Sequence, residues 1–156
     1  WQHRPESYGY VRARSQDPFK HPEIQPNYLA ADTDQQVILA AIKICRKLAQ
    51  TEALKPFVVE ETFPSVACQN DNDLLNSARE IGQSIYHLMG TCRMGSKDDK
   101  TAVVDAELRV HGIKNLRVID ASIMPTMVSA NLNAAVMMIA EKGADMVLGK
   151  LSAKPH

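Results

Sequence analysis

His87 is the residue of this sequence whose type and surroundings best suit proton transfer. Histidine takes up and releases a proton near neutral pH. His87 lies in a turn-forming segment from Tyr86 to Gly95 that also contains Gly90. Taken alone, this context is equally consistent with a structural core histidine and with a functional base. We expect solvated or structural roles for the other four histidines, which lie at the chain ends, in a Pro-rich stretch or in a turn: His3, His21, His111 and His156.

Asp120 is a second candidate, because it ends an apolar stretch that begins at Leu116. Ligands of α/β proteins bind at the carboxyl ends of strands, so an Asp in this position is often a ligand contact. The small residues Ala121 and Ser122 follow it. An Asp that caps the following turn would occupy the same position, and the sequence leaves both interpretations open.

Two asparagines, Asn131 and Asn133, lead into a helix that we expect to begin at Asn133 or Ala134. Residues 134–140 are apolar on every side, which predicts that the start of this helix is buried. Buried amides are costly without partners, so both side chains should be bonded to something. The helix start also offers free N–H groups and a positive partial charge, which suit an anion or an electron-rich carbonyl. Simple capping by Asn131 or Asn133 is the commoner alternative.

Helices must position these candidates, and periodicity predicts three of them, over residues 33–50, 71–83 and 133–148. The first should begin at a capping box formed by Thr33 and Gln36. Residues 70–73 supply cap candidates for the second helix, and Gly149 stops the last one. One face of the first helix is apolar and can pack on a core: Val37, Ala41, Ile44 and Leu48.

Short strands separated by turns should complete the fold. The expected strands are residues 8–14, 103–105, 108–110 and 116–120. Gly112 and Asn115 suit the turn between the last two strands. Residues 51–70 are expected to be irregular, and their adjacent carboxylates Glu60 and Glu61 are expected to be solvated.

The composition excludes several classes of function. The 156 residues are 45% hydrophobic and 23% charged, as in an ordered globular chain of one-domain size. Eighteen basic side chains balance eighteen acidic ones, so the basic excess of a nucleic-acid-binding protein is missing. The longest apolar run, residues 134–140, is too short to span a membrane. The sequence contains no GxGxxG, P-loop, HExxH or GxSxG motif.

Cysteine usage indicates the compartment. Cys45, Cys68 and Cys92 are widely spaced and form no CxxC pair, which supports neither a disulfide framework nor a metal site. We therefore expect free thiols in a reducing compartment, and hence a cytoplasmic location. Cys45 lies in a helical pattern and is expected in the core. The chain begins with Trp1 instead of Met, and we expect it to be part of something longer.

Several separate segments together resemble the glucose-methanol-choline (GMC) oxidoreductases over about residues 7–149. Tyr86-His87-x-x-Gly90-Thr91-Cys92-Arg93-Met94-Gly95 resembles the histidine motif of that family. The other matching segments occur in the family's order and spacing: residues 9–11, 26–29, 103–105, 108–112, 115–125, 129–134 and 138–145.

The resemblance implies a mixed α/β fold that forms the C-terminal part of a two-domain FAD-dependent enzyme. Residues 1–100 would belong to the substrate-binding domain and carry the histidine motif. Residues 101–150 would return to the FAD-binding domain as strands and a helix, and residues 151–156 would form a tail. The family carries its GxGxxG fingerprint in an N-terminal region that is outside this chain. That region, in the same or a separate polypeptide, is therefore an expected partner, and we expect the chain alone to be inactive.

The resemblance also implies roles for individual residues. His87 would accept the proton of an alcohol hydroxyl, and Asn131 would hold the same oxygen from the other side. Asp120 and Ala121 match the turn that meets the ribityl and phosphate region of FAD, while Asn133 and Ala134 match the helix start that faces the flavin pyrimidine ring. The expected reaction is oxidation of the CH–OH group of a choline-like or other primary alcohol, with hydride transfer to flavin N5.

Two alternatives stay open beside this hypothesis. The chain could be a non-catalytic binding module derived from the same fold, although His87, Asn131 and Asp120 together favour chemistry. It could also be one subunit of a split enzyme. The choice of alcohol, and of oxygen or another carrier as the final electron acceptor, does not follow from the sequence.

Overall fold

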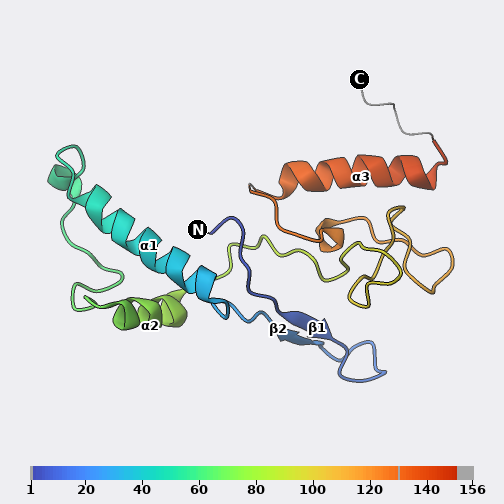
Figure 1. Ribbon diagram of the computed structural model, residues 1–156, viewed down its shortest axis with the longest axis horizontal. Coiled ribbons are helices and arrows are strands. Elements are labelled where there is room, and N and C mark those ends of the chain that lie inside the picture. The colour runs from blue at the N-terminus through green and yellow to red at the C-terminus, as the bar shows by residue number, and fades with distance from the viewer. Residues whose placement is uncertain (1, 130, 151–156) are drawn as a thin grey trace. The chain divides into compact units, whose positions relative to one another are not determined.

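The regular structure consists of helices and one small antiparallel sheet, in a computed structural model that describes residues 2–129 and 131–150. This agrees with the expected mixed fold at the level of its elements. The elements are β1 (Tyr10–Arg12), β2 (Glu23–Gln25), α1 (Asp32–Ala49), α2 (Asp71–Ile81), α3 (Asn133–Val147) and two 3-10 turns, Lys55–Phe57 and Ala121–Ile123 (Figure 1). The chain divides into two units, Trp1–Ser84 and Ile85–His156, which are described separately. The predicted tail, residues 151–156, lies outside the described residues.

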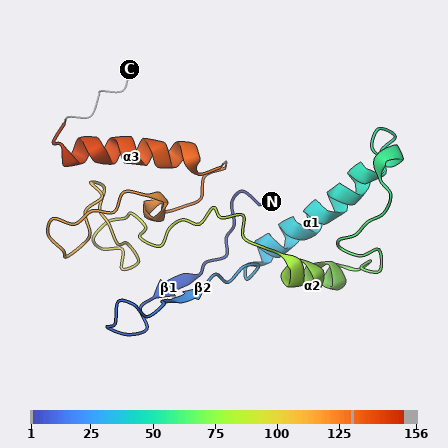
Figure 2. The same ribbon diagram turned by 180° about the vertical axis from the view of Figure 1, so that it is seen from behind.

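The first unit begins with a hairpin and two helices. β1 pairs with β2 in antiparallel register, with Val11 opposite Ile24, so the predicted strand forms but is shorter than expected. α1 and α2 lie side by side, as both views show (Figure 1, Figure 2). The side chain of Asn70 accepts a hydrogen bond from the Asp73 amide at 2.9 Å, which confirms the expected cap of α2.

The predicted capping box at the start of α1 is wrong. The helix begins at Asp32 with Ala31 as its N-cap, so Thr33 already lies inside the first turn, and no side-chain cap hydrogen bond forms. Asp34 instead ties the N-terminal segment to the helix. Its carboxylate is buried and accepts hydrogen bonds from Gln2 Nε2 (2.7 Å), the Glu6 amide (2.9 Å), and the amide (2.8 Å) and hydroxyl of Ser7.

The apolar face predicted to pack on a core is exposed on α1. Val37, Ile44 and Leu48 are 38%, 56% and 50% exposed, and Cys45, expected in the core, is exposed as well. The less exposed side of the helix lies elsewhere, at Ile38, Ile42, Arg46 and Ala49. Periodicity identified the helix correctly, but it could not decide which of its two apolar sides finds a partner within this chain.

The irregular segment after α1 is held by an ion pair that the sequence did not predict. Arg46 Nη2 lies 2.6 Å from Glu61 Oε1, and Arg46 Nε donates to the same carboxylate at 3.0 Å. Arg46 also donates to the carbonyl of Cys68 at 2.9 Å. Glu61 is therefore a structural anchor for residues 51–70, whereas its neighbour Glu60 is exposed as expected.

Among the described residues of the second unit, α3 is the only α-helix and there is almost no sheet. The three strands expected between residues 103 and 120 are reduced to isolated bridges, Val104 with Val110 and Arg109 with Arg117, and Val104 also pairs with Met94. Left-handed backbone at Leu108 (φ 64°), Gly112 (φ 78°) and Asn115 (φ 61°) turns the chain after every few residues, which prevents longer strands. The predicted turn at Gly112 and Asn115 is thereby confirmed.

A small core holds the second unit together. Its buried members come from the turns and from α3: Val104, Leu108, Ile123, Met124, Leu132 and Ile139. Met89, Met94, Met127 and Met146 pack against them, so thioethers fill much of the space between irregular segments. Methionine suits this role because its unbranched side chain adapts to gaps of uneven shape.

α3 is buried on one side only. Ile139 and Gly143 are buried, whereas Met137 and Met138 are 62% and 60% exposed. The expectation of a helix start buried on every side is therefore wrong for this chain by itself, because the chain contributes a partner for only one face. The helix ends at Val147, and Gly149 follows in left-handed conformation (φ 66°), as the sequence predicted.

Replacing one carboxylate oxygen of Asp34 by an amide nitrogen should destabilise the first unit, because both oxygens accept hydrogen bonds. Burial opposes ionisation of Asp34, but the hydrogen bonds from Ser7, Glu6 and Gln2 outweigh it and hold the pKa of the carboxyl below its ordinary value. We expect Asp34→Asn to lower the free energy of unfolding by about 2 kcal/mol in urea titrations. Asp32→Asn, an exposed change in the same turn, is the matched control and should cost less than about 0.5 kcal/mol.

The same contact predicts a pH dependence. Because the folded-state pKa of Asp34 is lowered, its contribution is fully present above the unfolded value of 3.8 and is lost as the pH falls through the folded value. The difference in stability between wild type and Asp34→Asn should therefore shrink in acid. A difference that stays constant from neutral pH to acid would contradict this role.

Gly143 is required by close packing. A Cβ atom at this position would lie 2.4 Å from Ile119 Cγ2. We expect Gly143→Ala to lower the melting temperature of the second unit although alanine is the better helix former, with a cost of about 1–3 kcal/mol from overpacking. Combining it with Ile119→Ala, which removes the clashing methyl group, should recover part of the loss. Additive losses in the double variant would rule out the steric explanation.

Candidate functional site

His87 lies in a short exposed segment with unusual backbone geometry. Its side chain is half-buried, and the neighbours Ile85, Tyr86 and Leu88 are 47%, 87% and 65% exposed. Tyr86 has a left-handed backbone (φ 63°), which is rare for a bulky residue and concentrates at functional sites. Exposed apolar side chains thus flank this imidazole on both sides in the sequence.

Backbone hydrogen bonds attach the histidine segment to the turn after Asp120. The amide of Gly90 donates to Ala121 O (3.4 Å), that of Cys92 to Ser122 O (2.9 Å), and that of Met94 to Ile123 O (2.8 Å). The two segments thus run side by side, although some thirty residues separate them in the sequence. We call these three bonds the histidine-segment ladder.

Gly90 makes the close approach of these segments feasible. Its φ is +83°, a conformation that other residues rarely adopt, and an added Cβ would lie only 3.3 Å from the Met124 carbonyl oxygen. The glycine of the motif therefore has a structural cause, because it lets the chain turn onto the ladder three residues after His87.

Asp120 caps the turn that carries the other side of the ladder. Its Oδ1 accepts a hydrogen bond from the Ser122 amide at 2.7 Å, so the capping interpretation is correct. The residue nevertheless remains exposed, which leaves carboxylate lone pairs accessible to a ligand. Ala121 follows within the same 3-10 turn and is half-buried.

The start of α3 is open. Leu132 is the N-cap and is buried, and no side-chain cap hydrogen bond forms at it. Asn131, Asn133 and Ala134 are exposed, and the side-chain amide of Asn133 donates weakly to Met137 Sδ at 4.0 Å. Simple capping by either asparagine, the commoner alternative, is therefore absent from the described residues. The first N–H groups of this helix remain suited to an electron-rich ligand.

One core positions the neighbours of all these candidates. Met89 and Met94 flank the ladder on the histidine segment, Ile123 belongs to the turn after Asp120, and Leu132 lies between Asn131 and Asn133. These residues pack in the same cluster, and α3 contacts the 3-10 turn Ala121–Ile123. The structure thus brings together the three segments that carry the predicted site residues, as their positions in Figure 1 show.

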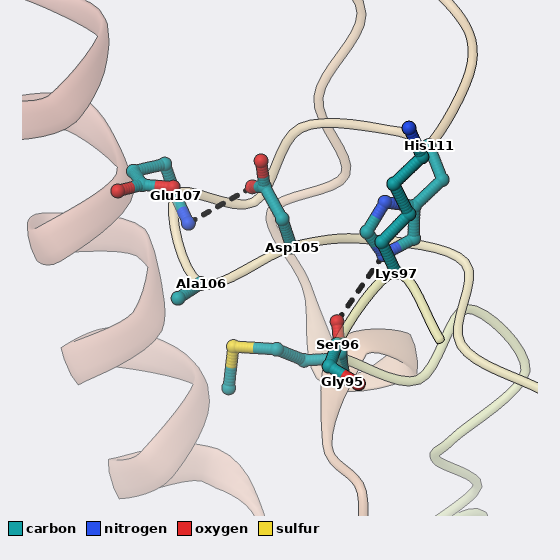
Figure 3. Close-up of a pocket in the computed structure, with 8 residues that line it drawn as sticks. Gly95, Ser96, Lys97, Asp105, Ala106, Glu107 and His111 are labelled. Carbon is teal, nitrogen blue, oxygen red and sulfur yellow. Dashed lines mark hydrogen bonds between the residues drawn. The ribbon is translucent and has the colours of Figure 1, made fainter. Parts of the chain in front are cut away.

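A groove of about 580 Å³ in the same unit contains none of the predicted site residues. It lies between residues 94–97 and 105–107, and His111 Nε2 lies 3.2 Å from the Gly95 carbonyl oxygen at its edge (Figure 3). His111 therefore has a structural role, as predicted. Burial opposes ionisation of Asp105, but hydrogen bonds from Arg109 and Glu107 prevail and lower the pKa of its carboxyl.

Sequence reasoning missed the part played by Arg93 within the histidine motif. Its Nη1 donates to Thr101 Oγ1 at 2.9 Å, and its Nη2 lies 3.4 Å from Asp99 Oδ2. Its carbonyl also accepts from the Val103 amide at 2.9 Å. Arg93 thereby closes the polar loop after the motif. The basic residue followed by a loop that contains Asp98 and Asp99 was the available signal, but the pairing within that loop has no sequence signature.

Residues 2–129 and 131–150 contain neither a cluster of metal-ligating side chains nor a membrane-spanning helix. No three His, Cys, Asp or Glu side chains come together as metal ligands in this part of the chain. None of the helices described is long and apolar enough to cross a membrane.

The sequence matches known proteins over most of its length. It is 47% identical over 147 residues to human mitochondrial choline dehydrogenase, covering 94% of this chain and 25% of that protein. Oxygen-dependent choline dehydrogenase of Escherichia coli is 46% identical over 147 residues, with coverage of 94% and 26%. The chain thus spans about a quarter of the length of these relatives. Because one relative is mitochondrial by name, the expected cytoplasmic location stays a prediction.

Solved flavoenzymes share the fold. Pyridoxine 4-oxidase from Mesorbium loti superposes with a TM-score of 0.79 at 31% identity, covering 96% of this chain and 29% of that structure. An FAD-dependent oxidoreductase from Chaetomium thermophilum superposes with a TM-score of 0.84 at 27% identity, covering 94% and 25%. The second of these proteins depends by name on FAD, the cofactor that the sequence resemblance implies. Residues 5–140 also match the C-terminal family model described as GMC oxidoreductase, and the chain therefore belongs to the GMC oxidoreductase family.

Proposed function

We propose that this chain forms the proton-handling and substrate-holding end of an FAD-dependent enzyme that oxidises the CH–OH group of a small alcohol. The observation that carries the proposal is the histidine-segment ladder, which attaches the segment of His87 to the turn of Asp120 in the core that also holds the start of α3. A non-catalytic module would gain nothing from presenting these three polar segments together. Relatives named choline dehydrogenase make choline and similar primary alcohols the first substrates to test.

His87 would act as the base. An alcohol hydroxyl that donates to its imidazole loses the proton to a ring nitrogen as hydride leaves the carbinol carbon. The amide of Asn131 would hold the same oxygen and stabilise its growing negative charge. The exposed apolar side chains of Ile85, Tyr86 and Leu88 would exclude water from this hydroxyl once substrate and the rest of the enzyme cover them.

The residues at the open helix start fit a flavin. The uncapped N–H groups at the start of α3, with Asn133 and Ala134 exposed beside them, suit the electron-rich edge of a pyrimidine ring. Asp120 and Ala121 would contact the ribityl and phosphate region, since the carboxylate is exposed and the ladder fixes the backbone of the turn that follows it. The bound flavin supplies the hydride acceptor. The positive end of α3 would stabilise the negative charge that arrives with the hydride.

The remainder of the enzyme would supply the dinucleotide fingerprint and most of the pocket. Within this proposal, residues 1–100 belong to the substrate-binding part and residues 101–150 to the return into the FAD-binding part. The apolar side chains left exposed on α1 and α3 support a larger fold that covers them, because patches of this kind mark interaction sites.

Loss of the base should slow turnover. We expect His87→Ala in the complete enzyme to lower kcat with choline by a factor on the order of 10² or more, the usual scale of general-base catalysis. Flavin absorption of the purified variant should stay at the wild-type level, which separates lost chemistry from lost cofactor. His21→Ala, at an exposed histidine of the first unit, is the matched control. An unchanged kcat in His87→Ala would refute the assignment.

At Asn131 the enzyme should tolerate another side chain that donates a hydrogen bond, but not the loss of the donor. Members of the GMC family, which this sequence resembles, have His or Asn at the position of Asn131. We therefore expect Asn131→His to keep kcat within about tenfold of wild type. Asn131→Leu, similar in size but without a donor, should lose about 10²-fold, as expected when one donor to a developing oxyanion is removed. Equal activity of the two variants would show that Asn131 does not touch the reacting oxygen.

A further inference from the structure

Residues 90–95 of the histidine segment are hydrogen-bonded on both edges. The histidine-segment ladder occupies one edge. On the other edge, Arg93 O accepts hydrogen bonds from the amides of Val103 (2.9 Å) and Val104 (3.4 Å). The Gly95 amide donates to Val104 O at 3.0 Å. The histidine segment is thus held like a central strand, with a neighbouring segment on either side.

The side chain of Arg93 adds a second connection on this edge. Its Nη1 donates to Thr101 Oγ1 at 2.9 Å, and its Nη2 lies 3.4 Å from Asp99 Oδ2. Asp99 Oδ1 in turn accepts from the amide (2.9 Å) and the hydroxyl (2.7 Å) of Thr101. The three side chains therefore form a closed network, and we call Arg93, Asp99 and Thr101 the Arg93 clamp.

The loop in which Asp99 and Thr101 lie is already supported by bonds of its own. The Asp99 amide donates to Ser96 O at 3.0 Å, and the Ala102 amide donates to Asp99 O at 3.0 Å. Hydrogen bonds from Thr101 and the positive charge of Arg93 lower the pKa of the Asp99 carboxyl, so it stays ionised beside the guanidinium. What Arg93 adds to this loop is a charged connection to the histidine segment.

Arg93 also couples the two edges of the segment. It lies between Cys92 and Met94, whose amides form two of the three bonds of the histidine-segment ladder. A backbone shift at Arg93 would break these bonds and move the residues before them. His87 lies three residues before Gly90, where the ladder begins. Displacing a catalytic group by about 1 Å can cost about 10²-fold in rate, so this register bears directly on proton transfer.

We propose that Arg93, Asp99 and Thr101 are positioning residues, which hold the histidine segment in the register that places His87 for proton transfer. The inference rests on the proposed function, because it needs His87 as the base. The three side chains act through the backbone. They hold the loop, and with it the Val103 amide, against the carbonyl of Arg93.

Steady-state kinetics of the complete enzyme with choline test this role. Arg93→Gln and Thr101→Val should each lower kcat by about tenfold or more at nearly unchanged KM, with flavin absorption and melting temperature close to wild type. Thr101→Ser keeps the hydroxyl and should recover most of kcat. The solvent isotope effect on kcat/KM should rise in the slow variants, because proton transfer to a misplaced base becomes slower relative to hydride transfer.

Three results would overturn the positioning role. They are wild-type kcat in folded Arg93→Gln or Thr101→Val, a loss that Thr101→Ser does not recover, and a loss of kcat without any change in the solvent isotope effect. The last of these is what a merely structural contribution predicts, since less folded enzyme lowers kcat without altering the proton transfer of the remainder.

A control variant and the variant at the base complete the test. Arg109→Gln removes the same charge from the same unit, where Arg109 pairs with Asp105 and Glu107 at 2.8 Å each, and it should keep wild-type kcat. An equal loss in Arg109→Gln would assign the effect to general loosening of the unit and refute the positioning role. Wild-type kcat in His87→Ala would refute the proposed function itself. Slow turnover of His87→Ala beside wild-type turnover of the clamp variants would refute the positioning role alone.

Discussion

The histidine-segment ladder is the interaction on which the candidate site depends. Three amides of the segment that follows His87 donate to three successive carbonyls of Ala121, Ser122 and Ile123. Backbone hydrogen bonds of this kind fix the register between two segments, because a shift by one residue would leave buried polar groups without partners. Asp120 fixes the conformation of one segment by capping its turn, and Gly90 gives the other the left-handed turn it needs. The position of His87 is therefore set by bonds that do not involve its own side chain.

A soft core supports this arrangement. The second unit has little regular structure besides α3, so its stability rests on a cluster in which methionines pack against Val104, Leu108 and Ile139. Flexible thioethers can fill the uneven spaces between turns that branched side chains would leave empty. Gly143 packs closely against Ile119, the residue that precedes Asp120.

The first unit is organised around a different constraint. The buried carboxylate of Asp34 collects donors from Gln2, Glu6 and Ser7 and thereby connects the N-terminal segment to the start of α1. Among the described residues, α1 and α3 each find cover on one side only, and apolar side chains on their other sides are exposed.

The sequence by itself determined the helices, the cap of α2, the turn at Gly112 and Asn115, and the family, because these depend on local periodicity, on turn chemistry and on motifs that short segments carry complete. It also singled out His87, Asp120 and Asn131, whose catalytic and cofactor roles stay proposals. Tertiary structure decided what depends on partners distant in the chain. It replaced the capping box at Thr33 by the contacts of Asp34, reduced three strands to bridges, and turned the apolar face at Val37 and Ile44 outward. Only the folded chain could show that the histidine segment lies against the turn of Asp120, because hydrogen bonds between backbone groups have no side-chain signature in the sequence.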